Sequence, residues 1–197
     1  MGHSRTDVVA AALRVLDEQG LEFCSMRRVA AALDVQPSAL YHHVPDKQTL
    51  LALMADELVS GVDGSGPAQL CRELRRAMLA VRDGADVVAT ASAYRLGASA
   101  VEARLAEVLR ERFDDMTLGE AVESARTLLH FVFGHTQSTQ MLLQAQEFAA
   151  LAAGRPADAA ADPLGASRAD LEASFDRGVA VILAGLAVRL QSVGTSG

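Results

Sequence analysis

The fold is decided by the stretch Met26-Arg-Arg-Val-Ala-Ala-Ala-Leu-Asp-Val-Gln-Pro-Ser-Ala-Leu-Tyr-His-His-Val-Pro-Asp-Lys47. Its first part predicts a helix over residues 26–33, because apolar residues recur there at spacings of three and four. Asp34 and the valine after it predict a tight turn. Pro37 suits the first turn of a helix, so a second and very short helix is expected over residues 37–43.

Two short helices joined in this way can place the second one in the major groove of DNA, which is about 12 Å wide. The helices can cross closely only if a small residue lies at the crossing, and Ala30 or Ala31 can supply it. Short polar side chains on the second helix can reach base edges, while Tyr41 and Lys47 can meet phosphates. The stretch therefore predicts a helix-turn-helix that binds double-stranded DNA. A helical hairpin without a DNA role is the alternative.

The rest of the chain also shows helical spacing of its apolar residues, so the predicted fold class is all-α. The segment GVDGSGP over residues 61–67 is the clearest break. We expect an N-terminal helix-turn-helix domain over residues 1–60 and a larger C-terminal helical domain over residues 67–197. Residues 149–169, rich in Ala, Asp, Gly and Pro, are expected to form a mobile loop. The other predicted helices cover residues 7–19 after the N-cap Thr6, 47–59 after the N-cap Asp46, 67–82, a short segment through Val87 and Val88, 101–113, 117–148 after a Thr117–Glu120 capping box, and 170–191.

Composition points to a protein of the cytoplasm. The N-terminus lacks the apolar segment of a signal peptide, and the longest apolar run, residues 179–188, is far shorter than the about 20 residues that span a bilayer. Cys24 and Cys71 show no metal-ligand spacing, so we expect two reduced thiols that pack as small hydrophobic side chains. We expect a soluble cytoplasmic protein with no cofactor, no metal and no membrane partner.

The net charge of −7 argues at first against nucleic-acid binding. Residues 1–47, however, hold five Lys and Arg against six Asp and Glu, so most of the acidity lies in the remainder of the chain. The cations of this N-terminal part gather at Arg27, Arg28 and Lys47. Composition is therefore compatible with a DNA reader, although it would not predict one.

The quoted stretch resembles the TetR family of transcriptional regulators, for which the pattern L-x-V-x-x-x-x-L-Y-x-H-V-x-x-K, here from Leu33 to Lys47, is typical. Similarity to the tetracycline repressor branch of that family continues in order along the chain, through Arg82-Asp-Gly-Ala85, His130-Phe-x-x-Gly134 and Gly185-Leu186. A match over the whole stretch, in register, favours DNA binding over the hairpin alternative.

The resemblance implies which residues bind DNA. Arg27 is expected at a base edge, and the turn residue Asp34 stands where the family usually has glycine. Because Asp tolerates a left-handed backbone better than most residues, we expect an intact turn at modest cost. Pro37 and Ser38 replace longer base-reading groups, so the operator should differ from that of the tetracycline repressor. The remaining implied contacts are Gln36, Pro37, Ser38 and Ala39 at the start of the recognition helix and Tyr41, His42 and Lys47 at phosphates.

The same resemblance argues against a tetracycline ligand. In tetracycline repressors a histidine on the short helix after Arg-Asp-Gly-Ala holds a Mg²⁺-chelated drug, and that position is Val88 here. The neighbouring threonine position is Ala91, and the carboxylate that reaches the metal through water is replaced by Ser138. Two further drug-contacting positions correspond to Asp63 and Leu70. Because valine cannot ligate a metal, recognition of a Mg²⁺–tetracycline chelate is not expected.

The resemblance instead implies a largely apolar cavity for another small molecule. Arg126 and His130 lie one helical turn apart, so they can face the same way as its polar anchors. The alternative is that His130 is a core histidine and Arg126 an ion-pair partner at an interface. The implied lining consists of Leu70, Leu74, Val88, Ala91, Val122, Arg126, His130 and Phe133.

The resemblance also implies a homodimer, in which the helices that follow Thr117 and Asp170 form a four-helix bundle with those of a partner. A small effector would change the spacing of the two readers and release a palindromic operator. The chain contains none of the common hydrolase, nucleotide-binding or metalloprotease motifs, so an enzyme is not expected. A DNA-binding repressor without a ligand remains the alternative, and repression and activation are both open.

Overall fold

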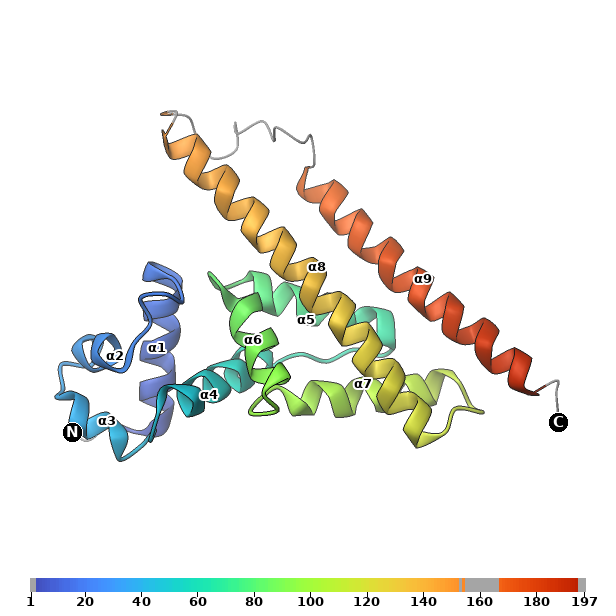
Figure 1. Ribbon diagram of the computed structural model, residues 1–197, viewed down its shortest axis with the longest axis horizontal. Helices are drawn as coiled ribbons and strands as arrows, with labels where there is room; N and C mark the ends of the chain where they lie inside the picture. The colour runs from blue at the N-terminus through green and yellow to red at the C-terminus, as the bar shows by residue number, and fades with distance from the viewer. Residues whose placement is uncertain (1–2, 153, 155–166, 195–197) are drawn as a thin grey trace. The chain divides into compact units, whose positions relative to one another are not determined.

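The computed structural model of the protein describes residues 3–152, 154 and 167–194. Within these residues it contains nine α-helices and no strand, which confirms the predicted all-α fold class (Figure 1). No helix in these ranges combines the length and the apolarity that crossing a membrane requires. The helices are α1 Arg5–Gln19, α2 Met26–Ala32, α3 Pro37–Tyr41, α4 Lys47–Val59, α5 Pro67–Leu79, α6 Gly84–Ala93, α7 Ser99–Arg112, α8 Leu118–Ala152 and α9 Arg168–Gly194.

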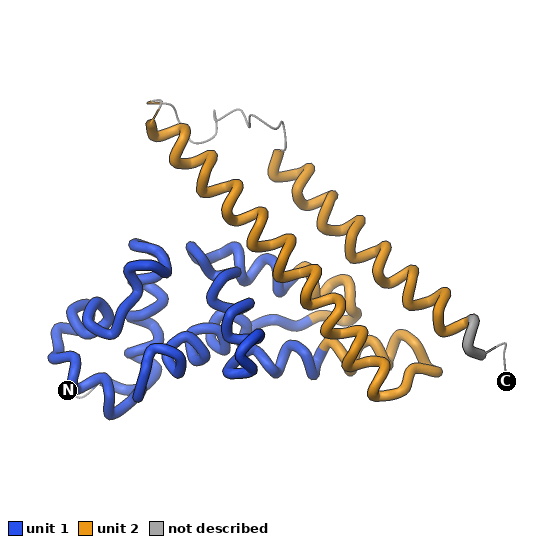
Figure 2. The backbone as a smooth tube through the Cα atoms, viewed as in Figure 1, with its two compact units in different colours: residues 1–63, 73–104 blue, residues 64–72, 105–197 orange. Residues whose placement is uncertain are grey.

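The helices gather into two compact units, which Figure 2 shows in blue and orange. Unit 1 comprises residues 1–63 and 73–104, and unit 2 comprises residues 64–72 and 105–197. The boundary passes through α5, and α6 belongs to the same unit as α1 to α4. The two units therefore differ from the two predicted domains, whose division between residues 60 and 67 stays a prediction.

The structure corrects the start of α1, whose N-cap is Ser4 and not Thr6. The Ser4 hydroxyl accepts a hydrogen bond from the Asp7 N–H over 3.2 Å, and the Asp7 carboxylate accepts one from the Ser4 N–H over 2.7 Å. This reciprocal capping box satisfies two N–H groups at once. Thr6 has Val9 three residues later, and a valine cannot return a hydrogen bond.

Helix α4 and the corner between α6 and α7 come very close within unit 1. Gly97 in that corner has no room for a side chain, because a Cβ atom there would lie 2.7 Å from the Ala52 carbonyl oxygen of α4. The next residue, Ala98, donates its backbone N–H to the Asp56 carboxylate of α4 over 2.7 Å. Ala98 has a φ of 59°, a left-handed conformation that is costly for a residue with a Cβ atom. The corner thus holds the C-terminal half of α4 at two neighbouring points.

Unit 2 is built on the long helices α8 and α9, which run antiparallel and side by side (Figure 1). The predicted capping box opens α8: the Thr117 hydroxyl accepts from the Glu120 N–H over 3.3 Å, and the Glu120 carboxylate accepts from the Thr117 N–H over 3.0 Å. Gly178 lets α9 approach α8, because a Cβ atom there would collide with the ring of Phe131. Gly178 therefore leaves room for the Phe131 ring between the two helices.

The predicted loop over residues 149–169 is too long at both ends. Helix α8 continues to Ala152, since the alanines after Phe148 are strong helix formers, and Gly154 follows with a φ of 62°. Helix α9 begins at Arg168, where Ser167 and Asp170 form a capping box. Residue 153 and residues 155–166 of the predicted loop lie outside the described residues.

The two cysteines are both buried and free, which confirms their prediction as small packed side chains. Burial raises the pKa of the Cys24 thiol above its ordinary value and that of the Cys71 thiol to about 12. Both thiols therefore stay protonated at neutral pH, and a protonated thiol is a poor nucleophile.

Candidate nucleic-acid interface and ligand pocket

The predicted helix-turn-helix is present in unit 1. Helices α2 and α3 are joined by a tight turn, in which the Val35 N–H donates to the Ala30 carbonyl oxygen over 3.0 Å. Asp34 in this turn has a φ of 56°, as expected for a residue that stands in for glycine. Of the two alanines proposed for the crossing, Ala30 is buried and Ala31 is exposed. Of the two, only Ala30 is therefore packed in the interior of unit 1.

Helix α3 buries one face and exposes the other. Leu40 and Val44 are buried, and they fix the inner face of this short element. Gln36 is the N-cap residue, but its side chain forms no capping hydrogen bond, and Pro37 lies in the first turn. The exposed Gln36 amide is therefore not used to close the helix and faces solvent at its start.

All residues predicted to bind DNA lie at the surface of unit 1. They come from the start of α2, from α3 with its flanking residues, and from the first residue of α4. Seven are exposed and Pro37 is half-buried, so their side chains are available to a partner. Their individual DNA contacts stay predictions for Arg27, Gln36, Pro37, Ser38, Ala39, Tyr41, His42 and Lys47.

Asp46 fixes the start of α4, directly before Lys47. Its carboxylate accepts a hydrogen bond from the Thr49 N–H over 2.7 Å, which confirms the predicted N-cap. The hydrogen bonds from the Thr49 backbone, and then from the Thr49 side chain, lower the pKa of Asp46 below its ordinary value. The charged carboxylate therefore stabilises the first turn of α4, in which Lys47 is the first residue.

We expect the contribution of Asp46 to stability to disappear in acid. A carboxyl group whose pKa is lower in the folded chain stabilises the fold above its unfolded pKa, and this stabilisation is lost as the pH falls through the folded pKa. In an Asp46→Asn variant the cap still accepts the hydrogen bond but does not titrate. Thermal unfolding from about pH 6 to about pH 3 should therefore show the wild type losing Tm relative to the variant below the ordinary pKa of 3.8. A constant difference in Tm across this range would contradict the role of the charge.

Two crossed hydrogen bonds connect the end of α1 with the corner between α5 and α6. The Asp83 carboxylate accepts from the Leu21 N–H over 2.8 Å, and the Asp17 carboxylate accepts from the Arg82 N–H over 3.0 Å. Asp83 itself has a φ of 55°, so it adopts a left-handed backbone in this corner. Because α1 belongs to the helix-turn-helix domain, these bonds tie the reader to α6 within unit 1. These bonds could not be predicted from the sequence, since the bonded residues lie 62 and 65 positions apart.

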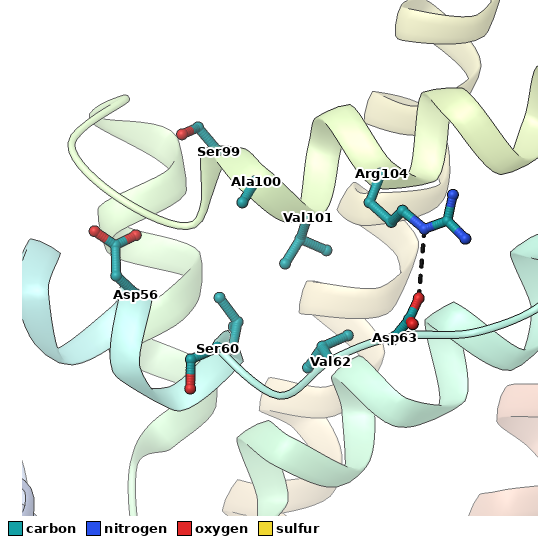
Figure 3. A pocket seen from close by; sticks show the side chains of 9 residues that line it. Asp56, Ser60, Val62, Asp63, Ser99, Ala100, Val101 and Arg104 are labelled. Carbon is teal, nitrogen blue, oxygen red and sulfur yellow. Dashed lines mark hydrogen bonds and ion pairs between the residues drawn. The ribbon is translucent and has the colours of Figure 1, made fainter.

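A pocket of about 660 Å³ lies within unit 1, between the end of α4 and the start of α7 (Figure 3). Asp56 and Ser99 lie toward one end of it, and Arg104 and Asp63 toward the other. The Nε of Arg104 lies 3.4 Å from Oδ1 of Asp63. The volume is in the range of sites that bind small molecules. Of these residues the sequence analysis had singled out only Asp63, because folding brings together segments about 40 positions apart.

None of the eight residues predicted to line a ligand cavity lines this pocket. They are divided between the two units, each of which holds some of them in its interior. Their roles therefore stay predictions. In unit 1, Leu74, Val88 and Ala91 are buried; in unit 2, Leu70 and Phe133 are buried, Val122 and Arg126 are half-buried, and His130 is exposed.

The two predicted polar anchors are placed differently from one another. Arg126 pairs with Glu123 on its own helix, with 3.1 Å between Nη1 and Oε1. His130 is exposed on the single chain, and its role stays a prediction. Among the described residues, no three His, Cys, Asp or Glu side chains are placed to hold a metal ion.

Comparison with known proteins shows which family has this helix-turn-helix. The family model described as "Bacterial regulatory proteins, tetR family" matches residues 8–54, which contain the helix-turn-helix. The model described as "Tetracyclin repressor-like, C-terminal domain" matches residues 67–190, more than half of the chain. The chain belongs to the TetR family. It is therefore a DNA-binding transcriptional regulator and not an enzyme.

Three relatives illustrate what this TetR-family chain is similar to. The tetracycline repressor protein class A from transposon 1721 of Escherichia coli is 31% identical over 92% of this chain and 89% of its own. The crystal structure of BioQ with its natural double-stranded DNA operator is 32% identical with a TM-score of 0.67, over 74% of this chain and 91% of that one. ActR of Streptomyces coelicolor, in complex with (S)-DNPA, is 25% identical with a TM-score of 0.72, over 96% and 100% of the two chains.

Proposed function

We propose that this TetR-family regulator binds a palindromic operator as a homodimer, represses transcription, and is released by a small, largely apolar molecule. The observation that carries the proposal is the exposed outer face of α3, opposite the buried Leu40 and next to the exposed Lys47. Residues 1–60 would read DNA. Residues 67–197 would dimerise and would bind the effector together with those of residues 56–63 that line the pocket at the end of α4. Since the matched family is one of bacterial regulators, the proposed location is the cytoplasm.

The homodimer is supported by apolar side chains that unit 2 leaves exposed. Val181 and Val188 of α9 are 71% and 67% exposed and, seven residues apart, share one helix face. Gly185 between them is also exposed and would let a partner helix come close. Large exposed apolar patches mark interaction sites. Light scattering should therefore give about twice the chain mass of 20.7 kDa, and a monomer at micromolar concentration would contradict the dimer.

Release of DNA would follow from a change in the spacing of the two readers. A dimer must hold its recognition helices about 34–36 Å apart to occupy two successive major grooves. Helix α4 begins at Lys47 and ends at the pocket, so one element joins the proposed DNA surface to a proposed effector site. A ligand that binds more tightly when α4 is displaced lowers the fraction of dimers whose recognition helices have the spacing that the operator requires. The shift in this equilibrium cannot exceed the difference in the ligand's affinity for the two positions of α4.

The experiment that tests the proposal is selection of bound sequences from random duplex DNA by purified protein, followed by a salt titration. We expect enrichment of a two-fold palindrome and affinity that falls steeply as salt rises, because Lys and Arg side chains displace counterions from phosphates. If protein refolded free of ligand enriches no palindrome at low salt, the proposal fails.

A second measurement distinguishes the proposed effector-controlled repressor from the alternative, a repressor without a ligand. A compound that binds the folded state raises the Tm by mass action. A screen that finds such a compound, and shows that it lowers operator affinity, supports an effector. A compound library that raises no Tm, on a protein that binds its operator, would favour the repressor without a ligand.

A further inference from the structure

The pocket between α4 and α7 has a charge pattern that points to the chemistry of its ligand. Its lining holds two carboxylates, Asp56 and Asp63, and one guanidinium, Arg104. Arg104 is paired with Asp63 at 3.4 Å. The Asp56 carboxylate accepts the neutral N–H of Ala98 and, within the described part of the chain, forms no ion pair. The excess negative charge of the pocket is therefore located at Asp56.

Apolar side chains fill the space between the charged ends. Val62 and Val101 lie between Asp56 and the Arg104–Asp63 pair, and Val59 also lines the pocket. A molecule that spans the pocket would place apolar atoms against these valines and one end against the Asp56 carboxylate. Burial of that apolar body would add to the affinity.

We propose that the effector is an organic cation, an ammonium or amidinium group carried on an apolar body, and that Asp56 binds its charged group. The proposal rests on the proposed effector function and names the chemical class of the effector. An anion would meet two carboxylates and a guanidinium that is already paired. A neutral donor can form a hydrogen bond with the Asp56 carboxylate, but only a cation adds direct Coulombic attraction to that hydrogen bond, so the cation is favoured over both.

Asp56 also connects the pocket with the helix that leads to the DNA surface. Its hydrogen bond with Ala98 holds α4 against a corner in which Ala98 adopts a strained left-handed backbone. A cation that draws the carboxylate into the pocket weakens this bond, and the corner is then free to relax. Lys47, at the proposed DNA surface, is the first residue of the same helix. Binding of a cation to Asp56 is therefore coupled to the position of the helix-turn-helix.

The coupling has a thermodynamic consequence that can be measured from either side. If the cation lowers operator affinity by some factor, operator DNA must lower the affinity for the cation by the same factor. The relation holds whatever the structural path between the two sites. It therefore tests coupling independently of where the cation binds.

The test uses three probes with the same phenylethyl body and a different charge: 2-phenylethylammonium, 2-phenylethanol and 3-phenylpropanoate. Each is titrated into the full-length ¹⁵N-labelled protein, and amide shifts are followed. We expect saturable binding of the ammonium at millimolar concentration, about tenfold tighter than that of the alcohol, with shifts in residues 56–63 and 98–104. Equal binding of ammonium and alcohol, shifts that map elsewhere, or no binding of the ammonium at millimolar concentration would each overturn the proposal.

A pair of variants isolates the charge of Asp56 from its hydrogen bond. Asp56→Asn keeps an oxygen that can accept from the Ala98 N–H, so the fold should be kept while affinity for the ammonium falls about tenfold. Glu57→Gln removes the same charge from the next residue, which is exposed and does not line the pocket, so its affinity should match that of the wild type. Unchanged affinity in Asp56→Asn, or an equal loss in both variants, would refute the role of Asp56.

Failure of this inference and failure of the proposed function give different results. A wild-type protein that selects a palindromic operator but does not prefer the ammonium refutes only the ligand class. A protein that selects no palindrome refutes the proposed function, whatever it binds in the pocket. Reciprocal weakening of DNA and ammonium binding supports both.

Discussion

Replacing Gly97 with alanine is expected to destabilise unit 1 by about 1–3 kcal/mol, toward the upper end, because the new methyl group would meet main-chain atoms. Its Cβ would lie 2.7 Å from the Ala52 carbonyl oxygen and 3.2 Å from the Ala52 Cα. A flexible side chain could turn away, whereas a helix backbone can only move as a whole. Relief therefore requires α4 and the α6–α7 corner to separate, which also lengthens the hydrogen bond between Asp56 and Ala98. The expected fall in Tm is about 2–12 °C for a chain of this length.

The matched control for this substitution is Gly61→Ala, in the turn that follows α4. A Cβ atom at Gly61 would have nothing within 4 Å, and its φ lies outside the left-handed region. We therefore expect its Tm to equal that of the wild type or rise slightly, since alanine restricts the unfolded chain more than glycine does. If Gly97→Ala melted with the wild type, the close contact between the corner and α4 would be refuted.

The Gly97→Ala variant also has a functional readout. Since α4 begins at Lys47, displacement of its C-terminal half should tilt the proposed DNA surface and lower operator affinity under conditions where the variant is still folded. A variant that is less stable but binds the operator normally would show that the α6–α7 corner contributes to stability but does not affect the position of the helix-turn-helix. It would then remove the corner from the proposed mechanism of release.

The parts of the fold that sequence analysis predicted are those fixed by neighbours in the chain. Asp34 could be assigned to a left-handed turn because local backbone sterics leave few other solutions between two short helices. Asp46 and the Thr117–Glu120 pair could be assigned as caps because capping joins residues three positions apart. The error at Thr6 is of the same local kind: two hydroxyl residues compete, and Ser4 prevails because Asp7 can return its hydrogen bond.

The parts that sequence analysis missed are those fixed by residues far apart in the chain. The bond from the Ala98 N–H to Asp56 spans 42 positions, and the bond from the Leu21 N–H to Asp83 spans 62. Neither backbone donor has a side-chain signature, so no pattern of letters marks it. The pocket between α4 and α7 escaped prediction for the same reason, because its acid and basic groups meet only after both helices are in place.

Operator affinity is expected to fall about tenfold when Tyr41 is replaced by alanine, with little change in the stability of the protein. Tyr41 is 52% exposed at the end of α3, so its side chain contributes little to the core, and its loss leaves no cavity. A plot of log affinity against log salt concentration has a slope that reports the counterions displaced from DNA. A phosphate contact adds about one unit to this slope only when the contacting group is cationic. Loss of the neutral hydroxyl should therefore lower affinity at every salt concentration while leaving the slope unchanged.

Tyr94 supplies the matched control, because the chain has only two tyrosines and Tyr94 is 66% exposed in the same unit. Tyr94→Ala should bind the operator like the wild type, so that loss of an exposed ring alone is shown to be harmless. Lys47→Ala gives the complementary signature, a weaker affinity together with a slope reduced by about one unit. If Tyr41→Ala bound the operator as tightly as Tyr94→Ala did, the tyrosine would have no place at the interface, and the exposed face of α3 would have to read DNA through Gln36 and its neighbours alone.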